Sequence, residues 1–117
     1  MKLLYVFFGG GIGSMLRYLM SSLFFQYTFP IATFLVNLFS CLIYGIVILS
    51  IGYFDLNKDW SLLLLVGFCG GLSTFSAFSF ETLNLIKEGY IYYAILNITF
   101  SIAICCGVLY FFVKRLQ

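Results

Sequence analysis

The stretch Gly67–Glu81, with the sequence GFCGGLSTFSAFSFE, lies inside an apolar run of the chain but is a poor candidate for a regular helix, because it contains three glycines and four hydroxyl side chains. In hydrocarbon every backbone polar group needs a partner. An irregular backbone is therefore tolerated only where it is buried in protein or lines a wet or ion-filled cavity. We expect the Gly-Gly-Leu-Ser-Thr segment at 70–74 to be a functional site.

The composition around this stretch indicates a membrane protein. The chain has 117 residues, is 63% hydrophobic and 9% charged, and contains no histidine. Such a composition lacks the polar shell of a soluble domain. The net charge of +2 is small and its cations are scattered, which argues against a nucleic-acid partner.

Apolar runs separated by short connections predict an all-α membrane protein with four transmembrane helices in a single domain. A helix needs about 20 apolar residues to span the hydrocarbon, and the chain divides into helices at about 3–25, 30–53, 60–81 and 90–113. We expect the connections at 26–30, 55–59 and 84–89. The N-terminal segment lacks a small-x-small cleavage site, so we expect a retained helix rather than a signal peptide.

The first predicted helix carries a glycine motif and a cation. Gly9 and Gly13 have the spacing that lets helix backbones approach closely, which favours helix packing over a phosphate loop. Arg17 costs about 2.5–3.5 kcal/mol near the centre of a membrane helix. It either snorkels to the nearer interface or attracts anions from a buried vestibule. This helix contains no acidic residue, so the cation site of a small multidrug transporter is excluded.

Polar side chains repeat every four residues in the second and fourth predicted helices. Thr33 and Asn37 share one face of the second helix, and Asn37 either bonds a neighbouring helix or donates into a pore. The fourth helix carries Tyr93, Asn97, Ser101 and Cys105. A ladder of neutral donors suits a dehydrated anion, and the alternative is hydrogen bonding between helices.

Beyond the irregular segment, Phe75 and Phe78 stand three residues apart, with Ser76 on an adjoining face. We expect the hydroxyl of Ser76 to be one of the pore donors. Aromatic rings have a positive edge that favours an anion without carrying a full charge. The alternative is packing or lipid contact, since the chain has 15 phenylalanines. Glu81 lies another turn along, either at the mouth of a pore or at a solvated helix end.

The four cysteines, at positions 41, 69, 105 and 106, lie in apolar segments and form no C-x-x-C pair. We expect them to act as small buried hydrophobic residues rather than in redox or metal chemistry. The sequence offers no histidine, paired acids or activated nucleophile, so it predicts no enzyme. A scaffold subunit would need none of the polar residues Asn37, Asn97 and Ser101.

Three segments together resemble the Fluc/CrcB family of small fluoride channels: GFCGGLSTFSAFSFE at 67–81, GGGIGSMLRY at 9–18 and PIATFLVNL at 30–38. The resemblance covers nearly the whole chain. It implies a passive, fluoride-selective channel in a bacterial-type plasma (inner) membrane, which exports cytoplasmic fluoride and relieves its toxicity. It also implies an antiparallel dimer of four-helix subunits with two pores.

The resemblance also assigns roles to individual residues. It implies a third helix broken near the midplane, where the backbone carbonyls of Gly70 and Ser73 from both subunits hold a structural sodium ion. The family usually has threonine at the second of these positions. The pore phenylalanines correspond to Phe75 and Phe78. The remaining family positions are the pore amide Asn37, the cation Arg17 and the polar track Thr33, Asn97 and Ser101.

This chain departs from the family pattern at two positions. Ala77 replaces a hydroxyl residue often found between the phenylalanines, and Asn97 stands where an aromatic or small hydroxyl residue is frequent. The charge pattern shows a modest bias as well. Lys2, Lys58, Lys114 and Arg115 fall on the side of the termini, against Lys87 and Arg17. A chain that inserts in both orientations should show almost no such bias, and this bias leans towards termini inside. We nevertheless expect a homodimer, with pairing to an oppositely oriented paralogue as the alternative.

Overall fold

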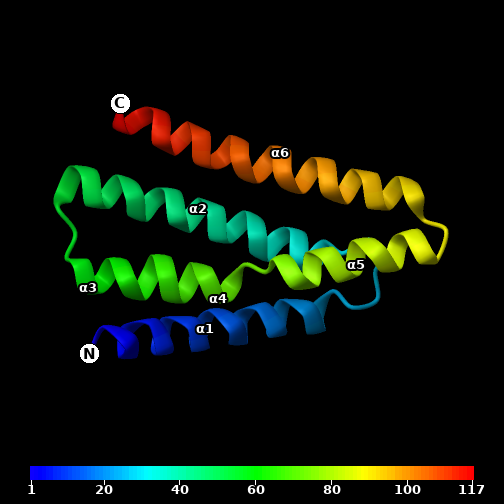
Figure 1. Cartoon of the computed structure of the whole chain (residues 1–117), viewed down its shortest axis with the longest axis horizontal. Helices are drawn as coiled ribbons and strands as arrows, with labels where there is room; N and C mark the ends of the chain where they lie inside the picture. The colour runs from blue at the N-terminus through cyan, green and yellow to red at the C-terminus, as the bar shows by residue number, and fades with distance from the viewer.

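The computed structural model describes residues 1–117 and is entirely helical (Figure 1). Its elements are α1 (Lys2–Leu23), α2 (Ile31–Phe54), α3 (Lys58–Ser61), the π-helix η1 (Leu62–Cys69), α4 (Gly70–Leu72), α5 (Phe75–Lys87) and α6 (Ile91–Leu116). The elements from α3 to α5 form one span, Lys58–Lys87. The structure thus has four helical spans that are long and apolar enough to cross a membrane, as the sequence predicts.

The predicted end of the third span is wrong. The sequence predicts a helix end near residue 81 and a connection at 84–89, but α5 continues to Lys87. Gly89 ends it by adopting a φ of +89°, while the Tyr90 amide reaches back to the Leu85 carbonyl at 2.8 Å. This is the usual glycine-based helix terminus. The single turn that remains leads directly into α6.

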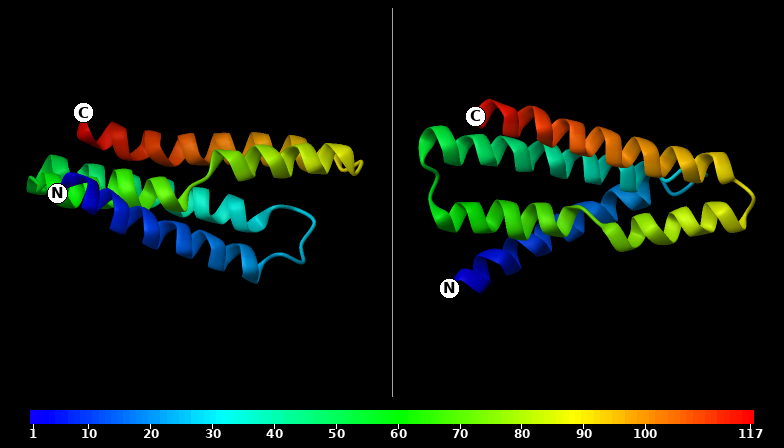
Figure 2. Two further views of the ribbon diagram at one scale, coloured as in Figure 1. Left: turned by 60° about the horizontal axis from the view of Figure 1, so that its bottom comes forward. Right: turned by 45° about the horizontal axis from the view of Figure 1, so that its top comes forward.

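The bundle is elongated and thin, measuring 49 × 32 × 19 Å, with both termini at the same end (Figure 1). α1 packs against η1 and α4, and α2 packs against α6. The third span changes neighbours along its length, because α5 contacts α6 instead of α1 (Figure 2). Large apolar side chains cover most of the outer surface, as expected for a protein that contacts lipid tails.

Glycines form the contact between α1 and the third span. A Cβ atom on Gly9 or Gly13 would overlap the backbone of η1, and one on Gly71 would overlap the backbone of Gly10. The two helix backbones therefore touch directly, which confirms the packing role predicted for Gly9 and Gly13. Close backbone contact of this kind drives helix association in lipid, where the hydrophobic effect does not.

Replacing Gly13 with alanine is expected to destabilise the fold by about 1–3 kcal/mol, because the added methyl group overpacks a rigid contact. The methyl carbon would collide with the carbonyl oxygen of Phe68. The matched control is Gly11→Ala, where no atom lies within 4 Å of the new carbon. The stability of the Gly13→Ala and Gly11→Ala variants is measured as the midpoint of unfolding in detergent. Equal midpoints for the two variants would contradict the role given to Gly13.

Candidate functional site

The irregular segment expected at 70–74 is an interruption of two residues in the third span. Gly70–Leu72 is still helical, whereas Ser73 and Thr74 are extended, with ψ of 155° and 126°. The Ser73 amide and hydroxyl both donate to the carbonyl of Cys69, at 3.0 and 2.8 Å, and close the first helix. The Thr74 hydroxyl oxygen accepts from the Ala77 amide at 3.2 Å and caps the second. Adjacent residues thus end one helix and start the next.

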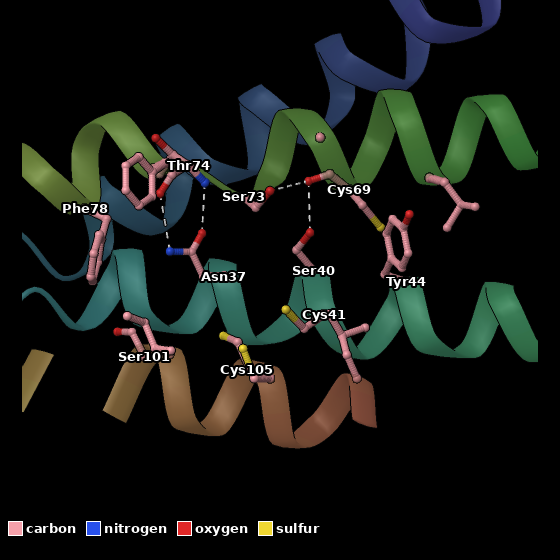
Figure 3. A pocket seen from close by; sticks show the side chains of 16 residues that line it. Asn37, Ser40, Cys41, Tyr44, Cys69, Ser73, Thr74, Phe78, Ser101 and Cys105 are labelled. Carbon is pink, nitrogen blue, oxygen red and sulfur yellow. Dashed lines mark hydrogen bonds between the residues drawn. The ribbon is translucent and has the colours of Figure 1, made fainter. Parts of the chain in front are cut away.

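Asn37 on α2 bonds the backbone of the break. Its Oδ1 accepts from the Thr74 amide at 2.8 Å, and its Nδ2 donates to the Thr74 carbonyl at 3.4 Å (Figure 3). The side-chain amide thereby replaces two backbone partners that a regular helix would supply. Without such a partner an orphaned backbone group inside a membrane costs several kcal/mol. Of the two roles left open by the sequence, the hydrogen bond to a neighbouring helix is present.

The carbonyl groups of Gly70 and Ser73 have lost their helical donors without a replacement in the chain, unlike the carbonyl of Thr74. The amide of Thr74, which would donate to Gly70 in a continuous helix, donates to Asn37 instead. The Ser73 carbonyl accepts no hydrogen bond from any backbone or side-chain donor. Gly70 is exposed, and an added Cβ would meet only the Leu65 carbonyl, at 4.0 Å. Neither oxygen therefore has a hydrogen-bond partner within the chain.

A groove of about 430 Å³, here called the break groove, lies between α2, the third span and α6 (Figure 3). Its polar lining includes Asn37, Ser40, Ser73, Thr74 and Ser101. The rings of Phe75 and Phe78 also line it, with their centroids 5.8 Å apart and their planes inclined by 35°. Phe78 is half-buried, whereas Phe75 is 79% exposed. The groove therefore unites hydroxyl, amide and aromatic groups beside the break.

Arg17, Thr33 and Glu81 lie together in a second cavity of about 230 Å³, the arginine cavity, which Thr74 shares with the break groove. The Arg17 Nε donates to the Gly71 carbonyl at 3.1 Å, and the Thr33 hydroxyl donates to Glu81 Oε1 at 2.6 Å. Thr33 and Glu81 also line a third cavity of about 430 Å³ at the end opposite the termini. The third cavity, the arginine cavity and the break groove thus lie next to one another, in this order, from the end opposite the termini to the break.

The polar side chains that repeat every four residues along α6, here called the polar stripe, lie in two environments; they belong to Tyr93, Asn97, Ser101 and Cys105. Asn97 is fully buried: its Nδ2 donates to the Thr82 hydroxyl at 2.9 Å, and its Oδ1 accepts from Ser101 at 3.3 Å. Thr82 in turn donates to the Phe78 carbonyl at 2.8 Å. Only Ser101 and Cys105 of the stripe line the break groove. The bond between Asn97 and Thr82 joins α5 to α6, and a pore role for Asn97 stays a prediction.

Replacing Asn97 with leucine is expected to destabilise the fold by about 0.6–1.7 kcal/mol, the range measured for hydrogen bonds between membrane helices. Thr99→Leu is the matched control, because Thr99 is exposed on the same helix. Unfolding in detergent and ion efflux from liposomes are measured on both variants. If Asn97→Leu lowers stability and efflux falls only in proportion to the loss of folded protein, Asn97 has a purely interhelical role. Lost efflux at unchanged stability supports the predicted pore role.

Ser76 is exposed, and its hydroxyl lies 3.3 Å from that of Thr74. It does not line the three cavities. The sequence predicts a site that includes Thr74 without a role of its own, and it predicts no role for Ser40 and Thr82. These three side chains form hydrogen bonds at the break or close to it. Two signals were available: Thr74 occupies a helix N-cap position before Phe75, and Ser40 lies one turn after Asn37. No sequence signal pairs Thr82 with Asn97.

Together, the four apolar spans and the polar break define a polytopic helical membrane protein. A family model described as "CrcB-like protein, Camphor Resistance (CrcB)" matches residues 4–113. The chain belongs to this CrcB-like family, which is a family of channels rather than enzymes.

Curated relatives cover most of the chain, and three of them, from different organisms, share the name "Fluoride-specific ion channel FluC". The relative from Pyrococcus horikoshii is 44% identical over 98 residues, or 82% of this chain and 80% of the relative. The one from Phocaeicola vulgatus is 46% identical over 91 residues, or 75% of each. The one from Coxiella burnetii is 42% identical over 113 residues, or 90% of this chain and 89% of the relative.

Proposed function

We propose that the protein is a passive, fluoride-selective channel that exports cytoplasmic fluoride and so relieves its toxicity. The observation that carries this proposal is the 42–46% identity to relatives named as fluoride-specific ion channels. The geometry agrees with it, because the break groove holds neutral donors and aromatic rings and no acidic side chain. Fluoride is small and a strong hydrogen-bond acceptor, so closely placed donors can replace its water.

The break supplies charge of both signs within one span. The C-terminal end of a helix presents carbonyl oxygens and attracts cations, while an N-terminal end presents amides and attracts anions. Here α4 ends at Leu72 and α5 begins at Phe75. Phe75 and Phe78, in the first turn of α5, line the groove. The positive end of α5 and the positive ring edges would both favour an anion in this groove.

A structural sodium ion is part of this proposal, held by the carbonyl oxygens of Gly70 and Ser73. These oxygens fit a hard cation, because one lacks its helical donor and the other accepts no hydrogen bond. When bound, sodium would neutralise the converging carbonyls and add positive potential beside the anion route. Hard cations are surrounded by several oxygen ligands in proteins. Two carbonyls from one chain are too few, which favours ligands from a second copy.

We further propose an antiparallel dimer with two pores, in a bacterial-type inner membrane. Phe75 lines the break groove yet is 79% exposed in the single chain, so a second copy would complete the groove around it. The cations at the two ends of the bundle differ only modestly in number, which is compatible with insertion in both orientations. An oppositely oriented paralogue is the alternative partner. Cross-linking of tagged copies from both sides of the membrane distinguishes the two arrangements.

The route into the groove would pass Arg17 and Glu81. The guanidinium of Arg17 lines the arginine cavity and would raise the potential there for an anion. The carboxyl group of Glu81 opposes this effect, but it accepts a hydrogen bond from Thr33. The second Nδ2 hydrogen of Asn37 could then donate in the groove itself, whereas the Ser101 hydroxyl would first have to release the Asn97 oxygen to which it donates. Conduction requires that no single contact bind too tightly.

Growth of a bacterial strain that lacks its own fluoride exporter tests the function in cells. Expression of this chain is expected to restore growth in fluoride-containing medium, most strongly at acidic pH, where fluoride enters as the neutral acid. An empty vector is the control. If cells that make folded protein in the membrane stay as sensitive as the control, the proposal fails.

A further inference from the structure

The chain's four cysteines, which come from three different spans, all line the break groove. Cys41 lies on α2, Cys69 at the end of η1, and Cys105 and Cys106 on α6. All four are free thiols. The sequence contains no C-x-x-C pair, and this gathering arises because α2 packs against both α6 and η1. Their predicted role as small buried residues does not account for the convergence on one cavity.

Cys41 and Cys105 form a pair across the interface of α2 and α6. Both residues line the break groove, and Figure 3 shows the two side chains facing the same space. Cys69 instead lies beside Ser40, and Cys106 is exposed. Although all four cysteines line the groove, no three cysteine, histidine or acidic side chains lie close enough together to hold one metal ion. Tetrahedral zinc therefore lacks its ligands, whereas two thiols suffice for a linear, two-coordinate soft metal.

We propose that Cys41 and Cys105 form a binding site for a soft, divalent, two-coordinate metal ion, for which mercury(II) is the probe. Each thiol releases one proton and each sulfur donates an electron pair, so one Hg²⁺ and two thiols give one neutral bis-thiolate complex and two protons. No electron is transferred. A neutral product suits a site flanked by apolar side chains, where a net charge is costly. A univalent ion such as Ag⁺ would leave one negative charge there.

The occupied site would close the proposed anion route. Cys41 follows Asn37 by one helical turn, and Cys105 follows Ser101 by one turn, so the metal lies beside two donors of the break groove. This consequence rests on the proposed fluoride channel, whereas metal binding itself does not. Micromolar HgCl₂ is expected to slow fluoride efflux from proteoliposomes by at least about tenfold, because a narrow route leaves no bypass. An excess of a small thiol is expected to restore it.

Serine variants test the assignment at nearly constant side-chain size. Cys41→Ser and Cys105→Ser are each expected to remain conducting and to lose mercury inhibition. Cys106→Ser, the matched control on α6, is expected to stay inhibited. A binding measurement on detergent-solubilised protein needs no conduction: the ultraviolet sulfur-to-mercury charge-transfer absorption should saturate at one ion per chain with two protons released. Inhibition that persists in Cys41→Ser, or the same absorption in both serine variants and the parent chain, overturns the metal site. Normal binding in a chain without efflux would refute the channel instead.

Discussion

Replacing Asn37 with leucine is expected to lower fluoride efflux by about 25-fold or more, because the variant leaves two backbone groups of Thr74 without partners. Each orphaned group costs about 1–3 kcal/mol, and about 1.4 kcal/mol corresponds to a factor of ten. The amide and carbonyl of Thr74 bond only to Asn37 in the structure. The chain would rearrange the break to satisfy them and displace the start of α5. Liposome efflux measures this loss.

Two further variants separate this effect from general damage to α2. Ser50→Ala removes a hydroxyl that bonds only within its own helix, to the Ile46 carbonyl at 3.0 Å, and efflux should remain normal. Asn37→Asp keeps an acceptor for the Thr74 amide but repels the Thr74 carbonyl and adds a negative charge to the groove, so efflux should again be lost. Efflux near the parent level in folded Asn37→Leu protein would show that the break does not depend on this amide.

Replacing Phe78 with isoleucine is expected to reduce fluoride efflux by up to about tenfold, since contacts made by an aromatic quadrupole are worth up to about 1.5 kcal/mol. Isoleucine keeps the apolar volume but has no aromatic quadrupole. The ring of Phe78 lines the break groove beside that of Phe75. Phe75→Ile should have a similar effect once a second copy surrounds its exposed ring. Efflux rates at equal protein density measure both variants.

The matched control for these rings is Phe80→Ile. Phe80 lies on the same helix, is 65% exposed and does not line the break groove. Its replacement should leave efflux within about twofold of the parent, as for surface changes away from special features. Unchanged efflux in both Phe75→Ile and Phe78→Ile would contradict the assignment of these rings to the anion route.

The lengths of the apolar runs were sufficient to predict the four spans, and the glycine spacing was sufficient to predict that α1 packs closely against another helix. The location of the break was predicted only approximately. The glycines at 70 and 71 stay helical, because Ser73 closes α4 through Cys69 and the cap at Thr74 starts α5. The end of α5 was misplaced, since the polar residues before Gly89 suggested a loop while the helix ends only where φ becomes positive.

The site was harder to predict than the spans, because it depends on which helix faces the break. Asn37 could be singled out as polar and costly, but the sequence does not reveal that its partner is the backbone of Thr74, 37 residues away. The burial of Asn97 against Thr82 likewise follows from the docking of α5 on α6. The convergence of the cysteines has the same origin, since Cys41 and Cys105 come together only when α2 packs against α6.

The most direct test of the account is ion efflux from liposomes that contain the purified protein, with a fluoride-selective and a chloride-selective electrode. A potassium ionophore balances the charge that leaves with the anion. If the break builds a narrow, donor-lined fluoride route, fluoride should escape at least about 100-fold faster than chloride. Equal loss of both anions, or retention of both by folded protein in the bilayer, would contradict it.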